Sequence, residues 1–252
     1  MTTPKTPSPS GRGLGEGPSA SAFPGYPKAA LPFLTNLAAN NEKPWFEANR
    51  PTYEAAIKAP TAALIEAVTA ALRARDLPLE GTPKRSPFRI HRDVRFSKNK
   101  SPYKTNVGTV WYRQGSGPRT GKDGAGILYF HLAPTGCFVA AAFYMPDPEI
   151  LSALRERIRV HPGKFHIMNK ALLDRGLVLD PSDTLTRMPK GFEDLAAKPE
   201  APFIRLKSYI VRRAVPDAIA QSPALIPAIT DLAADALPLL KFGWAATDEA
   251  RA

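Results

Sequence analysis

The segment from Phe88 to Lys104, FRIHRDVRFSKNKSPYK, carries the side chains of this 252-residue chain that are best suited to chemistry. It holds six arginines and lysines, one histidine and one aspartate within seventeen residues. An arginine presents five donors in a rigid fork that matches carboxylate and phosphate oxygens, and a lysine adds a compact positive charge. The composition therefore predicts a site for a phosphate-like or carboxylate anion.

The positive charge of the chain is concentrated rather than spread. The net charge is +11, and between Lys84 and Lys104 eight basic residues accompany a single acid, Asp93. A uniformly basic surface would favour weak attraction to any polyanion. Concentration in one short segment favours an organised local site instead.

Alternating residue types predict that Phe88 to Phe96 form a β-strand. One face of this strand would be apolar apart from Arg92, and the other would carry only ionisable side chains. Adjacent positive charge should keep the single carboxylate ionised. The residues of the ionisable face are Arg89, His91, Asp93 and Arg95.

A turn is expected directly after this strand, because SKNKSP is rich in serine, asparagine and proline. Lys98, Lys100 and Lys104 would project near the strand end, with Tyr103 beside them. Backbone amides of such a turn can add further donors for an anion.

A second basic element, FIRLKSYIVRR from Phe203 to Arg213, also alternates and predicts a strand with Arg205, Lys207 and Tyr209 on one face. Two interpretations stay open for it. Either it lines one pocket with the first strand, or its cations protect a solvated sheet edge. The predicted ligand-binding residues of both elements are Arg89, Arg92, Asp93, Arg95, Lys98, Lys100, Tyr103, Lys104, Arg205 and Lys207.

Three classes of function fit these residues. In an enzyme acting on phosphate esters, His91 beside Asp93 would transfer protons while arginines stabilise the developing charge. In a nucleic-acid-binding module, the basic strand and turn would contact phosphates and nearby aromatic residues would stack on bases. In a structural protein, the basic segment would meet an acidic partner. The sequence leaves open whether a reaction is catalysed; the candidate catalytic residues are Arg89, His91, Asp93 and Arg95.

Neither a metal site nor a cofactor is predicted. His91, Asp93 and His131 would make a plausible ligand set for a transition metal, but the neighbouring arginines would oppose a cation. Cys137, the single cysteine, begins an apolar stretch and is expected to be a buried, inert thiol. The sequence contains no nucleophile elbow, phosphate-binding loop or dinucleotide-binding glycine pattern.

The surrounding patterns predict a single α+β domain from residue 23 to residue 245, with a central, mostly antiparallel sheet and helices packed around it. Residues 1–22, rich in Pro, Gly and Ser, predict a disordered tail, and the glycine-rich stretch Arg113–Gly126 predicts a mobile loop. Apolar spacing predicts helices, and alternation predicts further strands. The helices are Lys28–Asn40, a short one after Pro44, Thr52–Arg75 with a kink or break at Pro60, two stretches from Asp147 to Gly176, and Pro223–Leu240, interrupted at Pro227; the strands are Thr105–Tyr112, Ile127–Ala133 and Cys137–Tyr144.

No apolar run approaches the roughly 20 residues that span a membrane, and no apolar signal-peptide region follows Met1. A cytoplasmic location without a membrane partner is therefore expected. The expected partner is an anionic small molecule or phosphate group, with nucleic acid as the alternative, and the oligomeric state stays open.

Four segments resemble, in order, the family known as domain of unknown function 2461: PFRIHRDVRFSKNKSPYKTN, YFHLAPTGCFVAAAFYMPDPE, PKGF and LKSYIVRR. The resemblance covers residues 23 to 243 and implies one compact domain with a focal basic motif, without implying a reaction. Three places depart from the family pattern: His91 for a frequent tyrosine, Asn99 for a usual aspartate, and alanines at 140–142 for a glycine-rich run. The matching motif positions are Arg89, Arg92, Asp93, Arg95, Phe96, Lys98, Lys100, Pro102, Tyr103 and Lys104.

Overall fold

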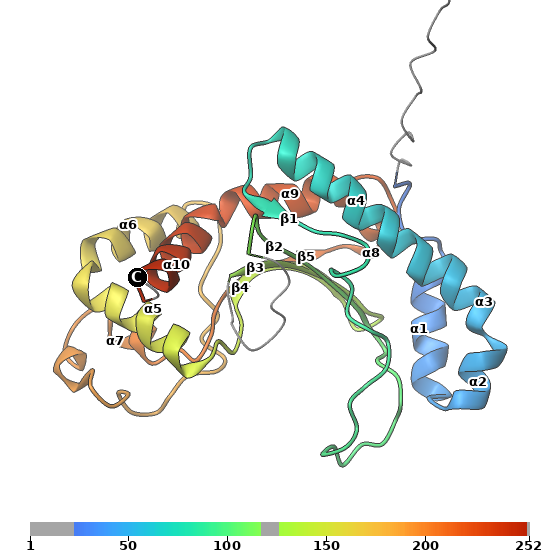
Figure 1. The fold of residues 1–252 in the computed structure, drawn as a ribbon, viewed down its shortest axis with the longest axis horizontal. Coiled ribbons are helices and arrows are strands. Elements are labelled where there is room, and N and C mark those ends of the chain that lie inside the picture. Colours follow the sequence, from blue (N-terminus) through green and yellow to red (C-terminus); the bar gives the residue numbers. More distant parts are fainter. Residues whose placement is uncertain (1–22, 117–125, 251–252) are drawn as a thin grey trace, which may run out of the picture.

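A five-stranded antiparallel sheet lies at the centre of the protein (Figure 1). The computed structural model describes residues 23–116 and 126–250, so the predicted tail and most of the predicted glycine-rich loop lie outside the described residues. Neighbouring strands follow one another in sequence, in the order β1-β2-β3-β4-β5. The strands are β1 (Leu79–Glu80), β2 (Val107–Arg113), β3 (Ile127–Leu132), β4 (Cys137–Phe143) and β5 (Tyr209–Val215).

Helices cover one face of this sheet and both of its ends, which confirms the predicted α+β class (Figure 1). The covered face is convex, and α4 and α9 lie across it. Period-two alternation explains its apolar character, because it presents residues such as Trp111, Phe130 and Val139, which are fully buried. The covering helices are α4 (Ala59–Ala74) and α9 (Leu225–Asp235).

The two ends of the sheet carry different groups of helices (Figure 1). At one end, α5, α6 and α10 pack together, with the short α7 nearby. At the other end, α1 to α3 form a small helical group; α8 leads into α9. The bounds are α1 (Ala30–Ala39), α2 (Lys43–Ala48), α3 (Arg50–Tyr53), α5 (Pro148–Val160), α6 (Pro162–Leu173), α7 (Ala201–Ile204), α8 (Asp217–Ala220), α10 (Leu237–Glu249), the π-helix η1 (Glu54–Lys58) and the 3-10 helix η2 (Glu193–Leu195).

Prolines sit where helices begin, and this corrects two predicted interruptions. Pro60 lies in the first turn of α4, directly after η1, so the helix runs on from Arg50 to Ala74 without a break. Pro227 lies in the first turn of α9, and the actual interruption comes at Ala236, before α10 begins at Leu237 with Pro238 in its first turn. The last helix ends at Glu249, beyond the predicted end of the domain at residue 245.

The helix from Arg50 to Ala74 is long and apolar enough to cross a membrane, the one such helix among the described residues. Its apolar side is buried within the protein, where Leu64, Ile65, Val68 and Leu72 are inaccessible to solvent. A core helix of this length meets the same criteria, and the packing of α4 against β2 and α9 accounts for its composition.

The predicted strand from Phe88 to Phe96 is wrong. These residues belong to an irregular extended arm, Phe88–Asn106, that leaves the sheet between β1 and β2 and projects away from it on its concave side (Figure 1). Its two halves are held by a few backbone bonds, such as Arg92 N–H to the Pro102 carbonyl at 2.8 Å. The alternation is present, but only the base of the arm, at Ile90 and Tyr103, packs against the core, and Phe96 farther along is left exposed.

The second predicted strand is wrong in its first half. Phe203 belongs to α7, and β5 begins only at Tyr209. Arg205 and Lys207 therefore precede the strand instead of lying on one of its faces, and Tyr209 is buried at 2% exposure in the core.

Candidate functional site

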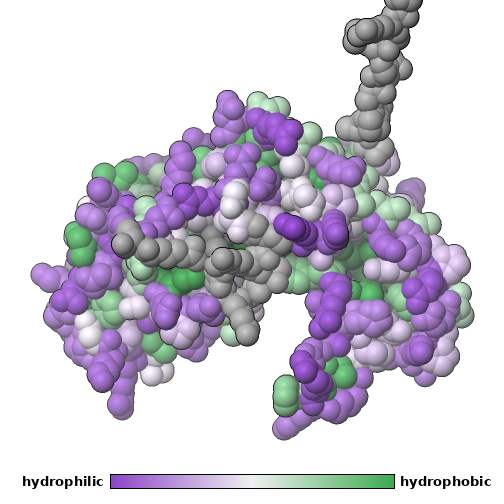
Figure 2. Space-filling view, viewed as in Figure 1, coloured by the Kyte–Doolittle hydropathy of each residue, from purple (hydrophilic) through white to green (hydrophobic). Residues whose placement is uncertain are grey.

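The concave face of the sheet holds a groove of about 550 Å³. No helix of the described residues covers this face, and the molecule is hollowed between the arm and the helical group around α5 (Figures 1 and 2). The groove is lined by Ile127, Tyr129 and His131 of β3, Phe138, Ala140 and Ala142 of β4, Ile210 and Arg212 of β5, Phe88, Lys104 and Asn106 of the arm, and Tyr144, Asp180 and Ser182.

Aromatic rings form a continuous patch within the groove. Alternation directs Tyr129 and His131 to the concave face of β3, and antiparallel pairing sets Phe138 of β4 opposite His131. The Phe138 ring lies 4.7 Å from the His131 ring and 5.8 Å from the Tyr129 ring, and Phe88 joins from the arm at 6.1 Å from Tyr129. The adjacent floor is made of small side chains, Ala140 and Ala142, which leave room above them.

Tyr129 and His131 also form a polar pair inside the groove. The Tyr129 hydroxyl and Nδ1 of His131 are hydrogen-bonded at 2.9 Å. Burial raises the pKa of Tyr129 to about 12 and lowers the pKa of His131 below its ordinary value. Both groups are therefore neutral at neutral pH and offer hydrogen bonds without charge.

Charged groups stand at the rim of this aromatic patch. Nζ of Lys104 lies 5.1 Å from the centre of the Phe88 ring, and partial burial together with Arg89 lowers the Lys104 pKa. On the other side, Arg212 pairs with Asp180 at 3.3 Å. Hydrogen bonds from Ser182 lower the pKa of Asp180. Lys104 has no acidic partner among the described residues, so it is the cation of the groove that an anion reaches without breaking an ion pair.

The arm displays most of the basic residues expected from the sequence. Arg95 donates two hydrogen bonds to Asp93, at 3.0 and 2.7 Å, and these bonds lower the Asp93 pKa to about 2. Of the six arginines and lysines on the arm, Arg95 is the one with an ion pair in the described part of the chain. The remaining five are Arg89, Arg92, Lys98, Lys100 and Lys104.

Tyr103 and His91 of the arm contact the helical group at one end of the sheet. Tyr103 is 3% exposed and its ring stacks on Phe46 at 4.2 Å. Asn41 clamps the Tyr103 backbone, with its side-chain amide donating to the carbonyl at 3.0 Å and its oxygen accepting from the N–H at 2.9 Å. The His91 ring packs against Tyr103 at 5.2 Å. These contacts anchor the arm to α2 and do not line the groove.

The structure does not bring the two predicted basic elements together. Lys207 pairs with Asp183 at 2.7 Å, and Arg205 directly follows α7, which lies at the far side of the molecule from the arm (Figure 1). Asp93 and Arg95, two of the candidate catalytic residues, are likewise engaged with each other on the exposed arm. None of the four candidate catalytic residues lines the groove.

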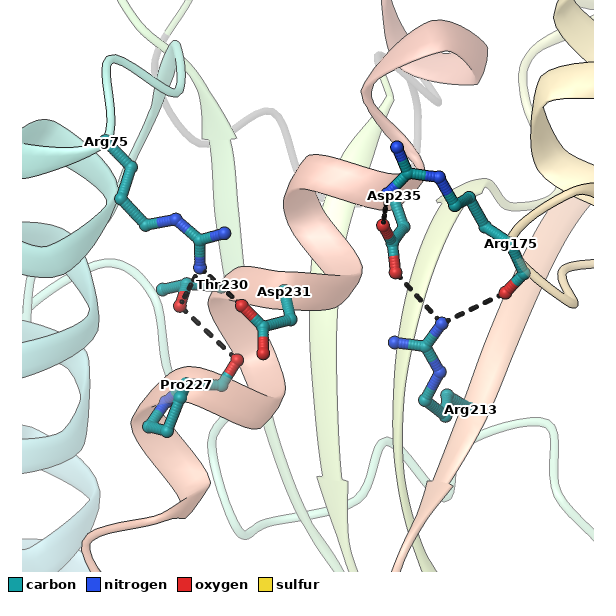
Figure 3. A network of polar contacts seen from close by, with 7 residues as sticks. All are labelled: Arg75, Arg175, Arg213, Pro227, Thr230, Asp231 and Asp235. Carbon is teal, nitrogen blue, oxygen red and sulfur yellow. Dashed lines mark hydrogen bonds and ion pairs between the residues drawn. The ribbon is translucent and has the colours of Figure 1, made fainter.

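Three arginines on the convex side are, by contrast, paired with acids. Arg75 meets Asp231 of α9 at 2.7 Å, while Arg175 and Arg213 share Asp235 at 2.8 and 3.0 Å (Figure 3). These pairs tie α9 to its surroundings. Cations without an ion pair lie on other described elements too, such as Arg73 of α4 and Lys164 of α6, and the arm contributes five of them within Phe88–Asn106.

Metal and thiol chemistry find little support in the described residues. They contain no cluster of three or more His, Cys, Asp or Glu side chains able to hold a metal ion. His91 lies on the arm and His131 in the groove. The Cys137 thiol is buried, and burial raises its pKa.

The aromatic groove is the feature that the sequence interpretation missed. Tyr129, Phe138 and Tyr144 lie on faces where an exposed strand would ordinarily carry charged side chains. Aromatic residues at period two on the non-core faces of two neighbouring strands were the available signal.

The half-buried imidazole of His131 leads to a prediction about acid stability. Its folded-state pKa lies below its ordinary value of 6.5, so the unfolded chain binds more protons in the range between the two. We expect the melting temperature to fall as pH drops below about 6.5, and to fall less steeply in His131→Gln. Thermal unfolding at several pH values, without ligand, measures both slopes. Equal slopes in the two proteins would contradict the assignment.

A family model described as "Conserved hypothetical protein (DUF2461)" matches residues 29–242. Neither the curated proteins nor the solved structures contain a match to the chain.

Proposed function

Because the chain belongs to the DUF2461 family, whose description names no activity, we propose a function from its geometry: the groove binds a nucleotide unit, free or within a single strand. The observation that carries this proposal is the continuous aromatic patch on an open sheet face, with an unpaired lysine at its rim.

Stacking supplies the first part of the proposed recognition. A base has two flat faces, and aromatic side chains on an open sheet bind such faces with about 1–3 kcal/mol per base. Phe138 and Tyr129 are the candidates for this contact. Ala140 and Ala142 beside them leave the space that a flat ring requires.

Charge supplies the second part. A phosphate attached to the stacked base would reach Lys104, whose ammonium lies beside Phe88 at the edge of the patch. Arg89, whose charge lowers the Lys104 pKa, adds to the positive potential there. A phosphate between Lys104 and Arg89 would relieve the repulsion between their charges. This relief adds to the binding free energy.

Polar atoms supply the third part. The Tyr129–His131 pair, Asn106 and Ser182 offer neutral hydrogen-bonding groups around the apolar floor. A purely apolar ligand would leave them without partners, which costs free energy. A heterocyclic base, with donors and acceptors on its edge, suits this mixed surface better.

Calorimetric titration with AMP, adenosine and inorganic phosphate tests the proposal. Phe138→Ala is expected to weaken AMP about tenfold through lost stacking, with the fold retained because Phe138 is partly exposed. Lys104→Ala should reduce the affinity for AMP to that for adenosine, and Lys104→Arg should restore the difference. Ile167→Ala, at an exposed apolar residue of α6, is the matched control and should bind as wild type does.

The ligand source is settled in the same experiment. Three results would overturn the proposal. They are adenosine binding as tightly as AMP, inorganic phosphate binding as tightly as AMP, and AMP binding that Phe138→Ala leaves unchanged. A single-stranded oligonucleotide that binds no more tightly than AMP identifies the free nucleotide as the ligand; tighter binding identifies the strand.

A further inference from the structure

The end of the arm has a defined shape without packing against the rest of the described protein. We name residues Asp93–Ser101 the arm tip. The Lys100 ammonium donates to the Val94 carbonyl at 3.0 Å, and Ser101 N–H donates to the Asn99 side chain at 2.9 Å. Arg92, just below, donates to the Ser101 carbonyl at 3.3 Å. These bonds join arm residues to one another. They give the arm tip its shape while leaving its outer surface free to contact a partner.

Phe96 is the outstanding residue of the arm tip. It is 96% exposed, the largest exposed fraction among the large hydrophobic residues that the structure describes. Burying a phenylalanine side chain stabilises a protein by about 1.5–3 kcal/mol. The exposed Phe96 ring does not contribute this stabilisation to the fold. Apolar atoms are visible at the end of an otherwise hydrophilic arm in Figure 2. A partner that covers the ring would gain this free energy as binding affinity.

The Phe96 ring is accompanied by a fixed cation. The Arg95 guanidinium lies 5.9 Å from the centre of the ring, and Asp93 holds it there through two hydrogen bonds. Lys98 and Lys100 follow within four residues. An aromatic face flanked by cations is the combination that binds a base together with its phosphates.

The arm and the groove form one path. Phe88 and Lys104 belong to both, and the arm extends from them on the concave side of the sheet (Figure 1). Phe96 lies eight positions after Phe88, which is at most about 26 Å of extended chain. A strand leaving the groove therefore has room for several nucleotides before it reaches the tip.

We propose that Phe96 stacks on a base of a single-stranded nucleic acid whose other end occupies the groove, while Arg92, Lys98 and Lys100 contact its phosphates. The inference rests on the proposed function of the groove and names the strand as its ligand. An anionic membrane also attracts cations around an exposed ring. It is disfavoured because Phe96 is a lone projecting ring, whereas surface helices that bind membranes bury a whole apolar face.

Fluorescence anisotropy with labelled oligothymidylates of increasing length tests this inference. Affinity should rise with length up to about eight nucleotides and then level off, within the range seen for single-strand sites. Phe96→Ala should remove about tenfold of the affinity for the longest strand and leave AMP binding unchanged. Phe96→Trp should retain the affinity, and Ile167→Ala serves as the exposed apolar control.

The outcomes separate the two proposals. AMP binding with no gain for longer strands, or a gain that Phe96→Ala leaves intact, overturns the inference and leaves the groove proposal standing. Loss of strand affinity in Phe138→Ala together with wild-type affinity in Phe96→Ala does the same. Phe96-dependent binding to vesicles containing anionic phospholipid, without binding to any oligonucleotide, assigns the arm tip to a membrane instead. Absence of binding to AMP and to every strand overturns both proposals.

Discussion

A rise in salt from about 50 mM to about 200 mM is expected to weaken the binding of an oligothymidylate of about eight nucleotides roughly 50-fold. Each phosphate contact with a single strand contributes about −0.7 to the slope of log affinity against log salt, because bound counterions are released. Lys104 at the groove and Arg92, Lys98 and Lys100 on the arm have no acidic partner in the described structure and supply about four such contacts. Anisotropy titrations at a series of salt concentrations measure this slope.

Charge-removing variants show whether the effect belongs to the arm. Lys98→Gln combined with Lys100→Gln should make the slope shallower by about 1.4. Lys58→Gln combined with Lys170→Gln removes the same charge from exposed helical positions, where each lysine pairs with an acid at 2.8 or 2.7 Å. Equal slopes in the two double variants would mean that the protein attracts strands through its overall charge, contrary to a focused arm.

Phe130→Ala is expected to lower the free energy of unfolding by about 3–5 kcal/mol, the usual cost of deleting a large buried aromatic side chain. Phe130 is 0% exposed on β3, and its ring stacks on Tyr26 at 6.1 Å under the helical layer. For a chain of this size the melting temperature should fall by about 6–20 °C. Thermal unfolding followed by circular dichroism measures the change.

Phe96→Ala is the matched control, since it makes the same chemical change at a fully exposed position. Its stability should stay within about 0.5 kcal/mol of the wild type, as expected for a surface site. A large loss of stability in Phe96→Ala would show that the ring packs within the protein, and would contradict its role as a contact for a partner. A small loss in Phe130→Ala would contradict the core described for β3.

The regular part of the fold follows directly from the sequence. In β2, β3 and β4, alternation coincides with apolar residues that face the covering helices, so the pattern and the packing select the same structure. The helices predicted at Lys28–Asn40 and Thr52–Arg75 correspond to α1 and to the helix from Arg50 to Ala74, because their apolar spacing matches a core that exists.

The arm and the second basic element are the two segments where alternation of residue types did not predict the structure. Phe88 to Phe96 alternates like a strand, yet a strand requires a neighbour over its whole length, and residue types within one segment do not reveal whether it has one. Lys207 depends in the same way on Asp183, which comes from a different segment. Clustering of charge was visible in the sequence; the groove beside it required the pairing of β3 with β4, which brings Phe138 opposite His131.

Because the arm is closed at its base, the segment beyond Arg92 and Pro102 should be replaceable without disturbing the rest of the fold. Arg92 and Pro102 are joined by a backbone hydrogen bond of 2.8 Å, so the nine residues between them begin and end at nearly the same place. Lengthening a loop whose ends already meet costs little, about 0.6 kcal/mol for each doubling. Substituting another hairpin between these two residues should leave the sheet and its groove intact. The same fold could then carry different arm tips, each suited to a different single-stranded nucleic acid.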